Sequence, residues 1–218
     1  MTPVRVHNLT FHGVGAPPRE LTPEEAHVWL SQERYLAVLD AIHGRDDVRI
    51  SFDDSFRTDI DVALPALLER GMTATFFVLA GRLQHPEHLA ETDLVRLREA
   101  GMTIGSHGMD HRNWRRLDAG ELTRELEDAR GVLAAAVNAP VTRTSVPFGA
   151  YDRHVLGRLR DAGYDHVYTS DGGPAREDAW LQARTSVTVV DAPDALAVPD
   201  PPPAAARRRL KQLVKRWR

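Results

Sequence analysis

The sequence contains no cysteine among its 218 residues. Disulfide bonds and metal sites built from thiolates are therefore excluded. It also lacks an apolar run close to the roughly 20 residues that a membrane-spanning helix needs; the longest are ATFFVLA and VLAAAV. The first ten residues, MTPVRVHNLT, contain no apolar stretch typical of a secretory signal peptide. From these absences we expect a protein that is made and kept in the cytoplasm.

Charge is distributed unevenly along the chain. The net charge is −3, but the last segment, ARRRLKQLVKRWR, has seven Lys or Arg residues and no acidic residue. Without these seven, 21 basic residues face 31 acidic ones, so the remainder carries −10. An acidic body of this kind argues against nucleic acid as a partner.

The first elements can be read from local patterns. The segment VRVHNLTFHGV is rich in β-branched residues and predicts a first strand. The segment TPEE predicts a helix start, with Thr22 as N-cap, Pro23 at the first helical position and Glu25 completing a capping box. We expect this helix to run to about Ile42. The segment VRISF then predicts a second strand.

A helix–turn–strand unit recurs through the middle of the chain. Each copy has the end of an amphipathic helix, then a residue suited to the left-handed conformation, and then an apolar strand. The residue suited to the left-handed conformation is Gly71, Gly101 or Gly163 in three copies and Asn138 in a fourth. Counting the units gives about seven strands, mostly separated by helices. This alternation predicts an α/β protein with a parallel sheet and helices outside, either open or closed into a barrel.

The end of the chain differs from the rest. We expect one domain over residues 1–192, a Pro/Ala-rich linker over 193–205 and a basic amphipathic tail over 206–218. Within the tail, helical spacing places the apolar residues Leu210, Leu213, Val214 and Trp217 on one face. Such a helix either lies on an anionic membrane surface or packs its apolar face on the body of the protein.

Three short motifs follow predicted strands, at the ends where parallel α/β proteins bind ligands. They are Asp53 with Asp54, His107 with His111, and the segment PFG. Taken singly, each has an ordinary explanation as a cap, a pair of surface histidines or a tight turn. Together, two histidines four residues apart and one carboxylate predict a metal site with open positions, as in catalytic centres. One Asp can then bind the metal, and the other can act as a base in metal-assisted hydrolysis of an amide or ester.

Three motifs in order, SFDDS, SHGMDH and VPFGAYD, resemble the polysaccharide deacetylases of the nodulation-deacetylase type. The resemblance covers about residues 4–190. It implies a single-domain, irregular (β/α) barrel of about seven parallel strands, and a hydrolase that removes the N-acetyl group from an amino-sugar substrate.

The resemblance also implies roles for individual residues. Asp53 would be the general base, and a divalent metal, usually zinc, would be bound by Asp54, His107 and His111. The backbone N–H of Phe148, which follows Pro147, would help to bind the oxyanion.

Two positions depart from the family pattern. The family commonly has an arginine where this sequence has Ser145, and Arg143 or Arg57 is a candidate replacement. Many members also have a late histidine that serves as general acid, but no histidine follows His166 here. His12, at the end of the first strand, is a candidate substitute.

Several alternatives stay open at this point. The two departures also suit a catalytically weakened protein that keeps its metal and binds carbohydrate or assists glycan assembly. Two histidines and a carboxylate also suit Fe(II) oxygenases, although their antiparallel folds do not match this alternation of strands and helices. Asp171, in YTSDGG, either forms a turn or contributes to the site. With the basic tail, the leading hypothesis extends to a lipid-linked amino sugar at the cytoplasmic face of the membrane.

Overall fold

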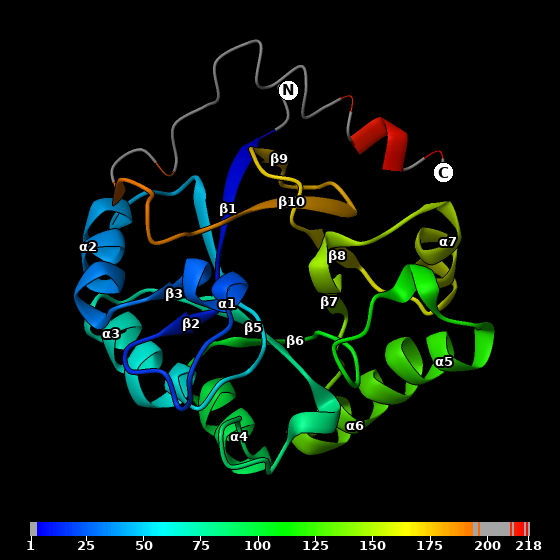
Figure 1. The fold of residues 1–218 in the computed structure, drawn as a ribbon, viewed down its shortest axis with the longest axis horizontal. Helices are drawn as coiled ribbons and strands as arrows, with labels where there is room; N and C mark the ends of the chain where they lie inside the picture. The colour runs from blue at the N-terminus through cyan, green and yellow to red at the C-terminus, as the bar shows by residue number, and fades with distance from the viewer. Residues whose placement is uncertain (1–3, 194–195, 197–209, 211, 216, 218) are drawn as a thin grey trace.

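Seven parallel strands close into a barrel, with helices on its outside (Figure 1). The computed structural model describes residues 4–193, 196, 210, 212–215 and 217. The barrel strands are β1 (Arg5–Phe11), β4 (Val48–Phe52), β5 (Ala74–Val78), β6 (Thr103–Ser106), β7 (Arg143–Ser145), β8 (His166–Thr169) and β10 (Leu181–Ser186). Each pairs in parallel with its neighbour, and β10 pairs with β1 to complete the ring. The single-domain barrel of about seven strands is confirmed.

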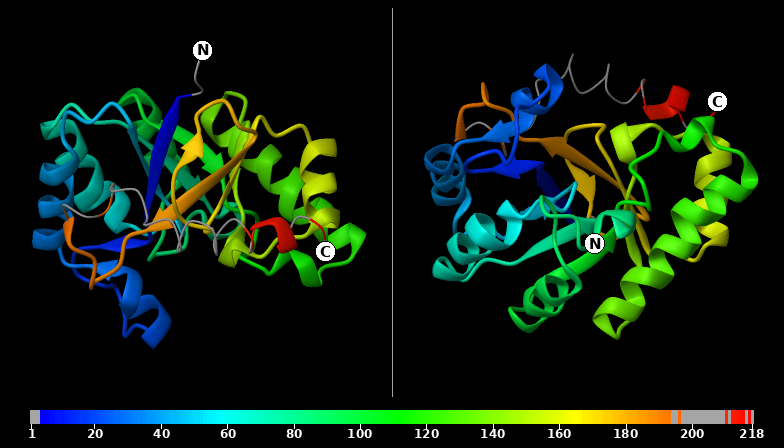
Figure 2. Two further views of the ribbon diagram at one scale, coloured as in Figure 1. Left: turned by 90° about the horizontal axis from the view of Figure 1, so that it is seen from above. Right: turned by 60° about the horizontal axis from the view of Figure 1, so that its bottom comes forward.

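The helices follow the strands around the barrel in chain order. The main ones are α2 (Gln32–Ile42), α3 (Leu64–Glu69), α4 (Glu91–Glu99), α6 (Ala129–Val137) and α7 (Arg153–Asp161). A π-helix, η1 (Asp59–Ala63), leads into α3, while α5 (Ala119–Thr123) and a second π-helix, η4 (Arg124–Asp128), lead into α6. The views in Figure 2 show the same ring of helices from two other sides. A short strand, β9 (Ala175–Arg176), pairs antiparallel with β1.

The residues expected to end the repeated helices adopt the expected conformation. Gly71, Gly101 and Gly163 have φ values of 62°, 80° and 74°, and Asn138 has φ 47°. Asn is among the few residues with a side chain that enter this left-handed region readily, so it replaces glycine after α6 at little cost.

The strands separate apolar from polar residues. On β4, Ile50 and Phe52 pack in the main hydrophobic cluster with the helices, while Ser51 and the following Asp53 are buried polar residues. Because side chains of a strand alternate between its two faces, the polar set points into the barrel. On β10 the same alternation turns Gln182 and Arg184 inward. The interior of the barrel is therefore able to hold buried charges.

The prediction of one continuous helix from Thr22 to Ile42 is wrong, because a short strand interrupts it. The capping box is present, but α1 (Pro23–Val28) ends early. Trp29 and Leu30 then form a two-residue strand, β3, parallel to β2 (Gly13–Val14), and Ser31 caps α2. The interruption buries both apolar side chains, and the Trp29 ring lies so close to Gly13 that a Cβ there would sit 2.2 Å from it.

No helix in the described part of the chain is long and apolar enough to cross a membrane. Most of the predicted linker, and part of the predicted tail, lie outside the described residues. Of the linker, Leu196 is described and is buried against the main cluster. The predicted boundaries at 192 and 205 stay predictions.

Candidate metal centre and catalytic site

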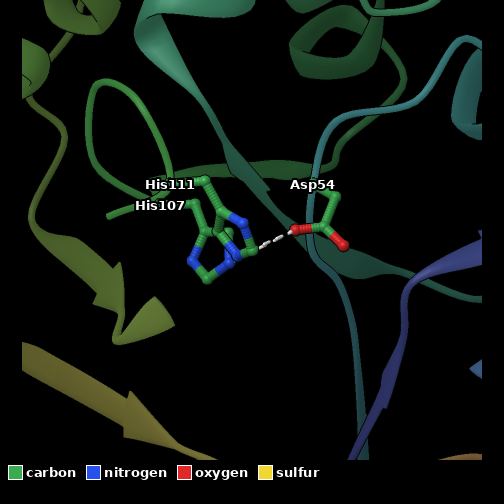
Figure 3. A group of neighbouring side chains, drawn as sticks. All are labelled: Asp54, His107 and His111. Atoms are coloured by element: carbon green, nitrogen blue, oxygen red, sulfur yellow. Dashed lines mark ion pairs between the residues drawn. The ribbon is translucent and has the colours of Figure 1, made fainter. Parts of the chain in front are cut away.

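The structure brings Asp54, His107 and His111 together, although they come from separate segments (Figure 3). Asp54 follows β4, and both histidines lie in the segment after β6. Asp54 Oδ1 lies 3.5 Å from His107 Nε2 and 3.4 Å from His111 Nε2. All three side chains stand at the carboxyl ends of the barrel strands, where ligands of such folds bind.

The histidines are prepared as metal ligands. His107 Nδ1 lies 2.9 Å from the carbonyl oxygen of Ser145. A carbonyl only accepts, so Nδ1–H donates, and this hydrogen bond directs Nε2 toward Asp54. Burial and the neighbouring His107 lower the pKa of His111 to about 4, so its ring is neutral at neutral pH. Burial alone would lower the pKa of His107, but Asp53 and Asp54 outweigh it and raise that pKa.

Asp54 provides the test of whether a metal fits. Its Oδ1 is buried and has no hydrogen-bond partner among the described residues. Burial raises the pKa of this carboxyl, but His107 and His111 outweigh burial and lower it, so Asp54 is ionised. An ionised, unsatisfied oxygen facing two imidazole nitrogens is a donor set suited to a divalent ion such as zinc. The residues present therefore fit the metal.

Two of the candidate metal ligands, and Ser55 beside one of them, occupy strained backbone. Asp54 has φ 69°, Ser55 has φ 54° and His111 has φ 56°, all in the left-handed region that non-glycine residues rarely adopt. Strain of this kind is found where the surrounding structure fixes a functional geometry. Here it turns the chain sharply after β4, so that Asp53 points into the barrel while Asp54 faces the histidines.

Asp53 lies beside this centre and is paired with an arginine. Arg184 Nη1 donates to Asp53 Oδ1 at 2.7 Å, and Nη2 donates to Oδ2 at 2.6 Å. The Ser145 hydroxyl donates to Oδ2 at 3.1 Å. Both charged side chains are buried, Arg184 completely. Burial raises the pKa of Asp53, but the Arg184 charge outweighs it and holds that pKa well below its ordinary value.

Arg184 was missed by the sequence analysis, and both expected replacements for the family arginine are elsewhere. Arg143 donates to the Thr75 hydroxyl at 3.3 Å, and Arg57 pairs with Asp93 at 2.8 Å. Arg184 comes from the last barrel strand and reaches Asp53 across the interior. Its only local signal is a charged residue at an inward position of a parallel strand.

Two further polar groups lie near the centre. His12 is partly buried, its Nδ1 has no hydrogen-bond partner among the described residues, and its imidazole is among the groups that lower the pKa of Asp53 and Asp54. Asp59, in the π-helix η1, is buried with neither carboxyl oxygen hydrogen-bonded to a described residue. Burial, and then the charges of Asp54 and Asp53, raise the pKa of Asp59 well above its ordinary value. This shift favours the uncharged form of Asp59.

The third motif lies on the other side of the histidines. Pro147 is buried at the start of the short helix η5 (Pro147–Gly149), and Phe148 is 65% exposed with φ 59°. The rings of Phe148 and His111 are 4.5 Å apart between centroids. The side chain of Phe148 therefore borders the candidate ligand His111.

Asp171 is used inside the protein rather than left free for a ligand. Its carboxylate accepts hydrogen bonds from the Tyr151 hydroxyl at 2.6 Å and the Thr169 hydroxyl at 2.9 Å. Lys215, in the C-terminal segment, donates to Asp171 at 2.6 Å and to the carbonyl of Gly149 at 3.1 Å. The tail is thereby attached beside the third motif.

Comparisons with known proteins agree with the fold and the motifs. A family model described as polysaccharide deacetylase matches residues 41–167. YxkH of Bacillus subtilis (strain 168), whose name places it among the polysaccharide deacetylases, is 28% identical over 169 residues, covering 78% of this chain and 58% of YxkH. The chitooligosaccharide deacetylase of Rhizobium leguminosarum bv. trifolii is 30% identical over 132 residues, covering 58% of this chain and 59% of that protein. The chain thus spans less than two thirds of both relatives.

Among solved structures, the Streptococcus pyogenes deacetylase PplD in complex with acetate has a similar fold. The TM-score is 0.80 at 20% identity, over 92% of this chain and 100% of that one. This likeness shows the barrel fold, and the family model covers more than half of the sequence. The chain belongs to the polysaccharide deacetylase family.

Proposed function

We propose that the protein is a metal-dependent hydrolase that removes the N-acetyl group from an amino-sugar substrate. The observation that carries the proposal is the convergence of Asp54, His107 and His111 around an unsatisfied carboxylate oxygen, with Asp53 adjacent. A family of deacetylases supports the reaction class. Zinc is the ion that we propose, because two imidazoles and one carboxylate form a common zinc donor set.

In the proposed mechanism a divalent ion, when bound, polarises the substrate carbonyl and acidifies water. Asp53 is ionised at neutral pH and accepts the proton of the attacking water. Arg184 and Ser145 hold both oxygens of Asp53, so the base cannot rotate away. The Phe148 N–H donates to the oxygen that becomes negative in the tetrahedral intermediate.

Departure of the amine requires a proton, and we propose His12 as its source. The His12 imidazole is among the groups that lower the pKa values of Asp53, Asp54 and His111. Its buried Nδ1 has no hydrogen-bond partner among the described residues. A general acid supplied from the first strand would replace the late histidine that the sequence lacks.

The position of Arg184 argues against the alternative of a protein that keeps its metal but has lost most of its catalytic activity. That hypothesis rested on two missing groups, an arginine for the base and a late histidine. Arg184 supplies the first with two hydrogen bonds to Asp53. The missing histidine alone favours a slower amine-release step rather than loss of hydrolysis.

Acetate release tests the proposed function. The zinc-loaded protein should release acetate from N-acetylated chitooligosaccharides or from a lipid-linked N-acetylglucosamine, and the metal-free protein should not. Fully deacetylated chitosan oligomers serve as the blank substrate. Acetate at the level of the uncatalysed control with every N-acetylated substrate would refute deacetylation.

We further propose that the tail contacts an anionic membrane, so that a lipid-linked substrate at the cytoplasmic face reaches the site. The described part of the tail is drawn above α7 in Figure 1, and Lys215 attaches it to Gly149 and Asp171. Its apolar residues do not pack on the barrel: Leu210, Leu213 and Val214 are exposed, and Trp217 is 78% exposed. An exposed apolar face in a segment with seven basic residues suits an anionic lipid surface.

Vesicle co-sedimentation tests the tail. The double variant Leu213→Ser, Trp217→Ser should lose about tenfold or more in affinity for vesicles of phosphatidylglycerol and phosphatidylcholine, because each apolar side chain contributes on the order of 1.5–3 kcal/mol when buried. Val190→Ser is the matched control, since Val190 is also an exposed apolar residue outside the tail. Equal binding by the double variant and the wild type would contradict membrane contact through this face.

A further inference from the structure

A second group of metal-ligating side chains lies outside the catalytic centre. His85, Glu87 and His88 stand in the connection between η2 (Ala80–Arg82) and α4, and each offers a ligand atom within 4.8 Å of the other two. We propose that these three residues form a second site for a first-row divalent ion, zinc in particular, which fixes the loop carrying Asp54.

His88 is the best-prepared ligand of the three. It is buried, and its Nδ1 lies 3.0 Å from the carbonyl oxygen of Asp54. The carbonyl can only accept, so Nδ1–H donates and the lone pair is left on Nε2. The ring also stacks on Phe56, with centroids 5.0 Å apart. A backbone carbonyl on one ring nitrogen and fixed packing are the usual preparation of a metal-ligating histidine.

His85 and Glu87 complete the donor set from the solvent side. The rings of His85 and His88 are 5.4 Å apart between centroids, at 69° to each other. Within the described part of the chain, Glu87 has an ion-pair partner in Arg19, at 3.5 Å. Arg19 is held more closely by Glu25 at 2.6 Å, so the Glu87 carboxylate can turn toward an ion. Two imidazoles and one carboxylate suit zinc, nickel or copper better than magnesium or calcium.

The position of this cluster gives the ion a role. The same loop is joined to the segment after Asp54 by backbone hydrogen bonds, from Arg57 N to Glu87 O at 2.8 Å and from Leu89 N to Ser55 O at 3.0 Å. That segment contains the left-handed residues Asp54 and Ser55. An ion on His85, Glu87 and His88 would hold this loop and, through the His88–Asp54 bond, the backbone of the catalytic ligand.

Zinc stoichiometry tests the second site. Tag-free, metal-free protein is dialysed to equilibrium against zinc, and bound zinc is measured by atomic emission. We expect two equivalents for the wild type and for the surface control His154→Ala, and one for His85→Ala. Glu87 is also not buried, and Glu87→Gln should bind one equivalent of zinc fewer than the wild type.

The variant His111→Ala separates this proposal from the proposed function. It should lose the catalytic equivalent and keep the one on His85, Glu87 and His88. If the catalytic centre fails to bind zinc, the wild type and His111→Ala each bind one equivalent and His85→Ala binds none, so the second site stands alone. Equal zinc content in the wild type, His85→Ala and Glu87→Gln would overturn the second site.

Discussion

Replacing Asp53 with asparagine should lower the rate of acetate release by about 10²- to 10⁴-fold, the contribution typical of a positioned general base. Asparagine can still accept a hydrogen bond from Arg184, but it cannot take a proton from water. Zinc binding should persist, because Asp53 is not among the three side chains that converge on the metal position. The measurement is initial acetate release under saturating zinc, with zinc content determined on the same sample.

Asp59→Asn is the matched control for this result. Asp59 is also a buried carboxyl near the centre, but burial and the charges of Asp54 and Asp53 raise its pKa and so favour its uncharged form. Asparagine resembles that uncharged form, so acetate release should stay within about tenfold of the wild type. If Asp53→Asn retained wild-type turnover, or if both variants lost activity equally, Asp53 would not be the base.

Replacing Arg184 with methionine should reduce the free energy of unfolding by about 3–5 kcal/mol, because it leaves the buried Asp53 charge without its partner. Arg184 is fully buried and Asp53 is 2% exposed, so solvent cannot replace the two lost hydrogen bonds. Urea denaturation at neutral pH measures the change. Arg143→Met is the matched control; it removes one long hydrogen bond to Thr75 and should cost less than about 1.5 kcal/mol.

The effect of Arg184→Met should depend on pH in a definite direction. In the wild type the pKa of Asp53 is depressed, so the pair stabilises the fold above the unfolded value of about 4 and loses this contribution as pH falls further. Without Arg184, burial raises the pKa of Asp53, and protonation then removes the unpaired charge. The difference in stability between the two proteins should therefore shrink toward acidic pH. A difference that stays constant from pH 7 to pH 4 would contradict the ion-pair explanation.

The barrel and the convergence of the three candidate metal ligands could be predicted because their signals are local. Glycines at 71, 101 and 163, with Asn138, mark the ends of successive helices, so the repeating unit is visible in the sequence. Asp54 and the two histidines directly follow strands, and the parallel fold brings such positions to one end of the barrel.

The features that were missed depend on contacts between distant segments. Arg184 is 131 residues from Asp53 in the chain, and only closure of β10 onto β1 brings it across the interior. The break between α1 and α2 follows from burial of Trp29 against Gly13, which helix propensity does not reveal. The attachment of the tail through Lys215 to Asp171 likewise joins distant segments and has no signal in the sequence.

Anomalous diffraction at the zinc absorption edge, from crystals of the zinc-loaded protein, tests the central claim most directly. The account predicts an anomalous peak at about 2.0–2.2 Å from an oxygen of Asp54 and from one ring nitrogen each of His107 and His111. Density for zinc only elsewhere on the protein, or an Asp54 carboxylate turned away from both imidazoles, would contradict it.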